Sequence, residues 1–465
     1  MRPRNSLPMI MTFCAGLACN IAFTKAIADT THITAPFKAS PGKQIFGYYT
    51  NWDTYDRNYQ PADIPLNDIT AALYAFAQIG NCAAPYATDS NPTQCNEGVY
   101  ATGVQDYKLH STDPGSDFYT VPQDYKHAGD HGTWIKGNMG RVIQAAHAQQ
   151  KPAILSILGY SLSVPFQTAI DDQHRAKFIK SIIDFLALVK KDNNGDGFDG
   201  IDVDWEPNDN QWTFLGQANA IQILQNYLKF IDELRTTLKK DYASYAWLTV
   251  ALPANPAIIQ AANQLVPGFW QHLANQVDYM DVMTYDYHGA FDVPKYTNFL
   301  APLNYDPKQP ENVNGRKTFN ITSTINAYLA ANVPASKIIV GIPAYGRAVE
   351  GVAVPGIYQN FTGPWQGEWD NTGTYDYKYI FNTLLADGGF KETHYPSAGA
   401  TAAFNATTGV WISYDNLDDI KAKTQFIIRK NLGGLMLWSL SGDLGLRDPN
   451  YAKASLLHNS HELLK

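Results

Sequence analysis

The strongest constraint on the fold is an alternation of short β-rich runs with amphipathic helical patterns, repeated about eight times along the chain. In the clearest helical pattern, Phe178, Ile182, Phe185 and Val189 form one apolar stripe. Repeated strand–helix units predict an α/β fold, a parallel sheet closed into a (β/α)8 barrel. An open doubly wound sheet is the alternative, but no glycine-rich phosphate-binding turn follows any of the runs. The expected strands are residues 44–50, 69–77, 153–159, 198–206, 246–253, 277–285, 337–344 and 434–440.

Two connections are too long for bare loops. The first, residues 79–131, is expected to form an ordered insertion on the rim of the barrel. The second, residues 347–415, predicts a small α+β insertion domain between strands seven and eight. The expected division of the chain is a signal peptide at 1–28, a lead at 29–43, a catalytic barrel at 44–346 and 416–465, and this insertion domain.

The first 28 residues have the pattern of a secretory signal peptide. Arg2 and Arg4 precede an interrupted apolar stretch, and a small-x-small sequence ends at Ala28. A transmembrane anchor is the alternative, but the stretch is short and contains polar residues. We therefore expect a secreted, extracellular protein, with a periplasmic location as the alternative.

Composition narrows the classes of function further. Cleavage after residue 28 would remove three cations and no acid, changing the net charge from −8 to −11, and an acidic protein is a poor candidate for binding nucleic acid. Cys82 and Cys95 then remain as a candidate disulfide. Two cysteines alone cannot form a His/Cys metal site, and an EF-hand-like run starting at Asp192 has Val203 where a bidentate Glu is needed. We expect a monomer with no metal, cofactor, membrane or nucleic-acid partner.

One expected strand carries the chemistry, because residues 199–206 read Asp-Gly-Ile-Asp-Val-Asp-Trp-Glu. Residues two apart in a strand share a face, so Asp202, Asp204 and Glu206 point the same way. Like charges about 6–7 Å apart repel and resist burial, which makes this arrangement costly as packing. In a (β/α)8 barrel, active residues lie at the carboxyl ends of strands, and we expect Glu206 to be the last residue of its strand. The three carboxyls are expected to share protons, with Glu206 as the donor and Asp199 on the opposite face.

This run resembles the D-G-x-D-x-D-x-E signature of glycoside hydrolase family 18, the chitinases, and the resemblance covers essentially all of the mature chain. The insertion also lies where the deep-cleft bacterial chitinases have an α+β domain. Two departures concern the shape of the sugar subsites. Leu158-Gly159-Tyr160 replaces the usual Gly-Gly-Trp, and Pro207 follows Glu206 without the usual intervening aromatic residue. Further similar runs are KGNMG (136–140), ILSILGY (154–160), YMDVMTYDYHG (279–289), GIPAYGR (341–347) and GLMLWS (434–439).

The resemblance implies a retaining hydrolysis of β-1,4 bonds between N-acetylglucosamine units. The candidate carboxyls all come from one strand, whereas an ordinary retaining glycosidase has two carboxyls flanking the bond. Family 18 is instead substrate-assisted: the acetamido oxygen of the sugar attacks its own anomeric carbon while an acid protonates the leaving oxygen. The implied roles are Glu206 as acid, Asp204 orienting the acetamido N–H, Asp202 sharing its proton, and Tyr285 bonding the acetamido oxygen.

Substrate-binding candidates lie at the ends of the other expected strands. Trp438 stands where the family keeps a tryptophan under the acetamido sugar, and Met283 shares strand parity with Tyr285 and is expected on the floor of the site. Core packing is the alternative for both. Asp286 has turn capping as its alternative role, and for Tyr345 and Arg347 a structural role is nearly as well supported. Trp52, Trp365 and Trp369 are candidate sugar platforms, with packing or a plain surface position as the favoured alternative for each. The full set of substrate-binding candidates is Trp438, Asp286, Met283, Tyr345, Arg347, Tyr48, Phe76 and Trp52.

The expected partner is chitin or chitooligosaccharides, or another glycan that contains N-acetylglucosamine. An endo-β-N-acetylglucosaminidase acting on N-glycans is the enzymatic alternative, although the insertion would wall a long cleft suited to a linear polymer. A non-catalytic chitin-binding lectin is disfavoured because Glu206 is present. A divalent-metal site built from the carboxylates is the third alternative.

Overall fold

The structure is a computed structural model that describes residues 42–80, 107–118, 137–207, 211–313, 315, 317–369 and 371–465. These residues belong to one compact unit, Pro36–Lys465. The predicted signal peptide, most of the lead, Cys82 and Cys95 lie outside the described residues, as does much of the 79–131 insertion. Within the described ranges, no helix has both the length and the apolar character needed to cross a membrane.

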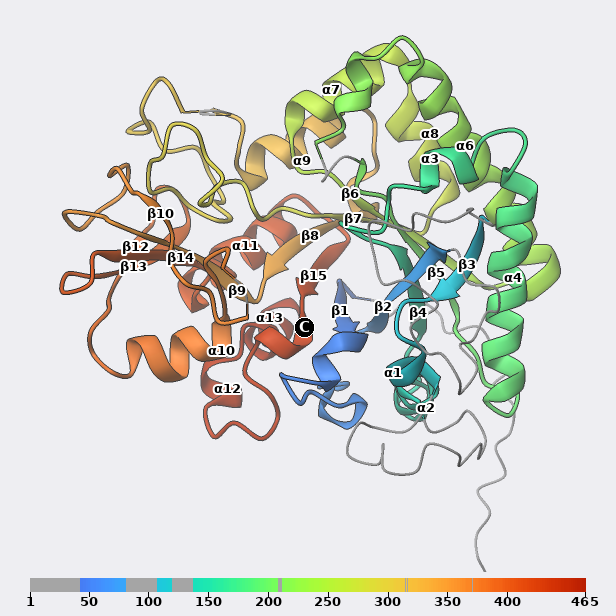
Figure 1. Ribbon diagram of the computed structural model, residues 1–465, viewed down its shortest axis with the longest axis horizontal. Coiled ribbons are helices and arrows are strands. Elements are labelled where there is room, and N and C mark those ends of the chain that lie inside the picture. Colours follow the sequence, from blue (N-terminus) through green and yellow to red (C-terminus); the bar gives the residue numbers. More distant parts are fainter. Residues whose placement is uncertain are drawn as a thin grey trace, which may run out of the picture. The chain divides into compact units, whose positions relative to one another are not determined.

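The described part of the chain contains a nine-stranded sheet, and eight of its strands run parallel and close into a barrel (Figure 1). The closing pair is β1 with β2, and β3 (Lys108–Ser111) adds to β2 in the antiparallel direction. The predicted (β/α)8 barrel is therefore confirmed. Its strands are β1 (Gln44–Thr50), β2 (Ala71–Gly80), β4 (Ala153–Leu158), β5 (Gly200–Asp204), β6 (Trp247–Leu252), β7 (Tyr279–Val282), β8 (Ile338–Pro343) and β15 (Gly434–Trp438).

Helices connect the strands on the outside of the barrel (Figure 1). Their starts are encoded locally: Asn255 accepts the N–H of Ala257 before α7 (Pro256–Leu265), and Asn416 forms a capping box with Asp419 at the start of α11 (Leu417–Arg429). The longer helices are α2 (Asn138–Ala148), α4 (Arg175–Asp192), α6 (Ala220–Thr237), α7 (Pro256–Leu265), α8 (Phe269–Gln276), α9 (Ile321–Ala330), α11 (Leu417–Arg429) and α13 (Leu456–Leu464). The shorter ones are α1 (Pro114–Phe118), α3 (Phe166–Ala169), α10 (Tyr377–Tyr379), α12 (Tyr451–Ala454), the π-helices η6 (Leu238–Tyr242) and η8 (Ile380–Leu385), and the 3-10 helices η1 (Asn51–Thr54), η2 (Pro61–Asp63), η5 (Thr213–Gly216), η7 (Ala335–Lys337) and η9 (Leu440–Gly442).

Side chains on each barrel strand alternate between two cores. On β1, Tyr49 packs with the helices, whereas Phe46 and Tyr48 belong to a separate cluster inside the barrel. On β5, Ile201 and Val203 join the helix-side core. The alternation therefore turns Asp202 and Asp204 toward the barrel interior, as the sequence predicts.

A second, antiparallel sheet occupies the segment predicted as the insertion domain. Its strand order is β10 (Gly363–Pro364), β9 (Tyr345–Glu350), β14 (Val410–Tyr414), β13 (Ala400–Asn405) and β12 (Lys391–Tyr395), and β11 (Thr374–Asp376) also pairs with β9. The sheet begins at Tyr345, two residues before the predicted start of the insertion. A bidentate ion pair joins it to the barrel, because Arg57, in the loop after β1, donates to both carboxylate oxygens of Asp376 at 2.9 and 3.0 Å.

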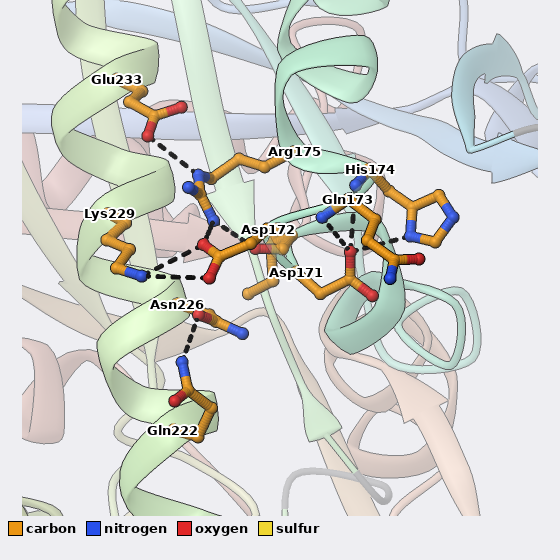
Figure 2. A network of polar contacts seen from close by, with 10 residues as sticks. Asp171, Asp172, Gln173, His174, Arg175, Gln222, Asn226, Lys229 and Glu233 are labelled. Carbon is orange, nitrogen blue, oxygen red and sulfur yellow. Dashed lines mark hydrogen bonds and ion pairs between the residues drawn. The ribbon is translucent and has the colours of Figure 1, made fainter.

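The two helices that flank β5 in sequence are joined by a polar network on their outer face. Figure 2 shows Asp172 accepting hydrogen bonds from Arg175 on α4 and Lys229 on α6, at 2.9 and 3.1 Å. Arg175 also donates to Glu233 at 3.0 Å. Because the Asp172 side chain is 63% exposed, solvent screens these ion pairs and each contributes little to stability.

A buried histidine ties α2 to the start of β5. The two ring nitrogens of His147 lie 2.5 Å from an Asp196 carboxylate oxygen and 2.8 Å from one of Asp199, whose carboxylate also accepts the N–H of Ala153. Asp199 therefore has a structural role, as its strand parity indicates. Burial lowers the pKa of His147, but the hydrogen bonds to Asp196 and Asp199 outweigh that effect and raise it to about 9.

This histidine predicts a pH-dependent stability. The pKa of His147 is higher in the folded chain than its ordinary 6.5, so its contribution is complete below pH 6.5 and is lost as pH rises toward 9. Urea unfolding at several pH values measures the free energy of unfolding of the wild type and of His147→Gln. As pH rises through this window, the wild-type value should fall by up to about 3 kcal/mol more than the value of the variant. Parallel curves for the two proteins would contradict the assignment.

Candidate active site

The strand that carries the carboxyls ends earlier than predicted. β5 ends at Asp204, so Glu206 lies two residues beyond it rather than at its last position. The physical reason lies in the neighbouring strand. β4 ends at Leu158, which pairs with Asp204, and the chain then turns away through Leu158 (φ 80°) and Gly159 (φ 99°), leaving no β4 partner for the residues that follow.

Asp202 is fully buried inside the barrel and accepts three hydrogen bonds. Its donors are the hydroxyls of Tyr48 at 3.0 Å, Ser156 at 2.6 Å and Thr249 at 2.8 Å. Burial raises the pKa of the Asp202 carboxyl, although these hydrogen bonds oppose part of the rise. Tyr48, predicted as a substrate-binding residue, is thus buried with its hydroxyl directed to Asp202.

The surroundings of Asp204 give its ionised form little support. Its Oδ1 atom is buried and has no hydrogen-bond partner among the described residues. Burial raises the pKa of Asp204 well above its ordinary value, and the charges of Glu206, Asp202 and Asp281 raise it further. Carboxyls held together in this way favour shared protons over full ionisation, and Asp204 is one of the groups whose protonated form is favoured.

Asp281 on β7 is a site residue that sequence reasoning missed. It is fully buried, and neither of its carboxylate oxygens has a hydrogen-bond partner within the described ranges. Burial, followed by the charge of Asp202, raises its pKa well above the ordinary value, and the nearby Tyr48 hydroxyl, although outside hydrogen-bond geometry, opposes part of the rise. A signal was present in the sequence, because Asp281 shares strand parity with Met283 and Tyr285 and hence their face.

Tyr285 lies on β7's side of the barrel interior, in the same segment as Asp281. Burial raises the pKa of its hydroxyl well above the ordinary value, and the charges of Asp204 and Glu206 are among those that add to the rise. Its position depends on Gly341, because a Cβ there would lie 2.8 Å from the Tyr285 ring. The hydroxyl is 4.0 Å from the Met436 sulfur, and the edge of the Tyr345 ring packs against Tyr285.

Four of the predicted aromatic residues form one row. Trp438 stacks on Phe76 with ring centroids 5.8 Å apart, and its edge meets Tyr48 at 5.3 Å. Phe76 in turn contacts Trp52 at 6.0 Å. Because Tyr48 also bonds Asp202 and Trp52 is 42% exposed, the row leads from the buried carboxyls to the protein surface.

Met283 is buried in the cluster inside the barrel, whereas Asp286, Tyr345 and Arg347 lie at the junction with the second sheet. Arg347 donates to both carboxylate oxygens of Asp286 at 2.9 Å and leans over the Tyr345 ring, so these three residues form one unit. Trp369 is 40% exposed and lies against the Arg57 guanidinium, 4.7 Å from its ring centroid.

Three further aromatic residues differ in their exposure. Trp365 stacks on Tyr375 at 4.9 Å, which supports a packing role for it. Phe291 and Tyr160 are more than half exposed, on the loops after β7 and β4, and sequence reasoning did not select them.

Comparison with known proteins identifies the family to which this site belongs. Residues 44–443 match the family described as Glycosyl hydrolases family 18. This chain belongs to that family. It is 33% identical over 441 residues to Chitinase A1 of Niallia circulans, which covers 91% of this chain and 60% of the relative. It is 31% identical over 450 residues to Endochitinase 1 of Metarhizium robertsii, and this alignment covers 93% of this chain and 90% of the relative.

Solved structures agree with the family assignment. Chitinase ChiA74 from Bacillus thuringiensis superimposes with a TM-score of 0.72 at 27% identity, covering 91% of this chain and 70% of that chain. The predicted recognition as a family 18 chitinase is confirmed by these likenesses. The match includes β5, β7 and the segment of the second sheet.

Two other features of the described chain bear on the choice of site. A groove of about 570 Å³ lies between α4 and α6 and is lined by residues such as Ile179, Ile183 and Asp232, but it contains none of the predicted site residues. Among the described residues, no group of three or more His, Cys, Asp or Glu side chains is arranged to hold a metal ion. The barrel interior therefore remains the candidate active site.

The hydrogen bonds to Asp202 predict a shift in the pH dependence of the family 18 activity. Thr249→Val removes one donor from the ionised carboxylate, so the Asp202 pKa should rise further and the acidic limb of kcat/KM should move up by about one pH unit. Rates on a fluorogenic chitooligosaccharide, measured across pH, provide the test. Thr424→Val is the matched control, because this buried hydroxyl bonds only backbone carbonyls on α11. An unmoved limb in Thr249→Val would contradict the role of Thr249.

Proposed function

We propose that this protein is a secreted chitinase that hydrolyses β-1,4 bonds between N-acetylglucosamine units with retention, by substrate-assisted catalysis. The observation that carries the proposal is the row of carboxyls on one strand. Asp202 is buried and hydrogen-bonded, Asp204 follows it on the inner face, and Glu206 lies just beyond the strand end with 9% of its surface exposed. Such a row can supply a proton and a nearby negative charge from the same side of the scissile bond.

In the proposed reaction Glu206 protonates the glycosidic oxygen as the C1–O bond breaks, while the acetamido oxygen bonds to C1 and forms an oxazolinium ion. Asp204 accepts the acetamido N–H, and Tyr285 donates its hydroxyl toward the acetamido oxygen. The positive charge of the oxazolinium ion favours ionisation of Asp204, whose proton passes to Asp202. General acid catalysis of this kind contributes roughly 10²–10⁴-fold.

The second half of the proposed reaction reverses these proton movements. Water attacks C1, the glutamate formed in the first half takes a proton from that water, and the acetamido group is regenerated. Because C1 is inverted twice, the product keeps the β configuration. Substrate and water supply every reacting atom other than the transferred protons.

Several surfaces support a linear polymer of N-acetylglucosamine as the substrate. Trp52, which is 42% exposed at the outer end of the aromatic row, offers a flat apolar face that suits a sugar ring. The second sheet is fixed beside the barrel loops by the Arg57–Asp376 and Arg347–Asp286 pairs, and in this proposal it forms one wall of the site that binds the polymer. The curated relatives carry the names chitinase and endochitinase.

Secretion is proposed from residues 1–28 alone, which have a charged start, an apolar stretch and a small-x-small end. The N-terminal sequence of the protein recovered from the culture medium tests it. A start at Asp29 is expected. A chain that stays in the cytoplasm with its first residues intact would contradict export.

The acetyl group of the substrate should be required for cleavage. We expect fully acetylated chitin oligomers to be cut with initial release of β-anomers, and fully deacetylated oligomers of the same length to resist cleavage, because they lack the attacking oxygen. Anomer-resolved product analysis measures both. Equal rates on the two substrates, or an accumulating glycosyl ester on the enzyme, would overturn the mechanism. Faster release from a high-mannose glycoprotein than from chitin oligomers would favour an endo-β-N-acetylglucosaminidase.

Glu206→Gln should lower turnover by about 10²–10⁴-fold while leaving oligosaccharide binding intact, because shape and hydrogen bonding persist but the proton is lost. Steady-state rates and calorimetric titration with a chitooligosaccharide measure the two effects. A Glu206→Gln rate like that of the wild type would remove Glu206 as the acid. If the wild type itself bound oligomers but cut none, a lectin would replace the enzyme.

A further inference from the structure

The backbone of Glu206 is held by a side chain from the neighbouring loop instead of by the sheet. β5 ends at Asp204, so no β-ladder bond fixes residue 206. The N–H of Glu206 instead donates to the Ser163 hydroxyl oxygen at 2.9 Å. Ser163 is 3% exposed, which keeps water from competing for this hydrogen bond.

Ser163 is itself fixed to two backbone segments. Its hydroxyl donates to the Gly159 carbonyl at 2.9 Å and lies 3.4 Å from the carbonyl of Asp204. Ser163 thus contacts the backbone of both residues that flank Trp205, namely Asp204 and Glu206. Its hydroxyl uses both its donor and its acceptor capacity in this position.

The turn that presents Ser163 is also fastened to β5. The N–H of Gly159 donates to the Asp204 carbonyl at 2.8 Å, and the N–H of Leu162 donates to the Gly159 carbonyl at 3.2 Å. Residue 159 must be glycine here, because its φ is 99° and a Cβ would lie 2.8 Å from the Phe76 ring. The turn at 158–163 therefore replaces the missing ladder and extends the line of β5 to Glu206.

We propose that Ser163 is a positioning residue for the acid Glu206, and this rests on the proposed function of Glu206. A side chain leaves its backbone in a direction set by the backbone, so the Ser163 hydrogen bond determines where the Glu206 carboxyl meets the glycosidic oxygen. Proton transfer depends steeply on that geometry, and misplacement by about 1 Å can cost on the order of 10²-fold. Ser163 contacts no reacting atom in this scheme.

The test is Ser163→Ala in the full-length protein, assayed on chitin oligomers. We expect kcat to fall by about 10–100-fold with KM changed by less than about threefold, because the defect lies in proton delivery and not in sugar binding. The pH profile of kcat should also shift, since Glu206 and Asp204 influence each other's ionisation. Ser163→Thr keeps the hydroxyl and should recover most of the lost rate.

Ser181→Ala is the matched control. The Ser181 hydroxyl also accepts a backbone N–H, from Leu109 at 2.9 Å, and donates to a carbonyl, that of Phe178 at 2.7 Å, but it lies on α4 away from the carboxyls. Its removal should leave kcat and the pH profile unchanged. Thermal melting of both variants monitors folding. If Ser163→Ala does not fold, Ser163→Cys replaces it, because its thiol forms weaker hydrogen bonds and should give a kcat between those expected for wild type and for Ser163→Ala.

The outcomes separate this proposal from the proposed function. If Glu206→Gln is inactive and Ser163→Ala keeps the wild-type kcat and pH profile, Ser163 has no positioning role although the acid assignment stands. If Glu206→Gln remains active, the acid assignment fails first. If both single variants are impaired, the double variant should lose no more activity than Glu206→Gln alone, and an additive loss would overturn the proposal.

Discussion

The burial of carboxyl groups inside the barrel is the constraint on which the site depends. The interior of a (β/α)8 barrel is ordinarily filled by apolar side chains, and here Asp202, Asp204 and Asp281 share it. Only Asp202 receives hydrogen bonds from several strands, through Tyr48, Ser156 and Thr249. Burial raises the pKa of all three, but donors oppose the rise most directly at Asp202, while Asp204 and Asp281 keep carboxylate oxygens without a hydrogen-bond partner in the described part of the chain. This difference in environment assigns different roles to chemically identical groups.

The mouth of the barrel depends on a different kind of interaction. Arg57 and Arg347 each form a two-pronged pair with a carboxylate, and each pair joins a barrel loop to the second sheet. The planar guanidinium fixes both distance and orientation, which a single lysine contact would not do. Because Arg57 also lies against Trp369, and Arg347 against Tyr345, the same pairs orient aromatic surfaces at the rim.

The sequence determines the barrel because its signals are local and repeated, and each predicted strand overlaps an observed one. The predicted end of β5 is wrong because a strand ends where its neighbour turns away. The neighbouring strand β4 turns at Leu158, which lies more than 40 residues from the end of β5 in sequence. Asp281 was missed because its burial against Asp202 depends on how distant strands close the barrel. Pairs such as Asp286–Arg347 were named as separate candidates, but their joint geometry depends on tertiary structure.

The replacement of a glycine by Leu158 shows how this chain departs from its family without losing the turn. A non-glycine residue at φ 80° costs on the order of 1–2 kcal/mol, whereas full burial of a leucine side chain contributes about 1.5–3 kcal/mol. Leu158 is completely buried in the helix-side core, so its burial offsets the backbone cost. Gly159 has no such compensation, because Phe76 occupies the space its side chain would need. The turn that carries Ser163 to Glu206 therefore tolerates a side chain at its first position and excludes one at its second.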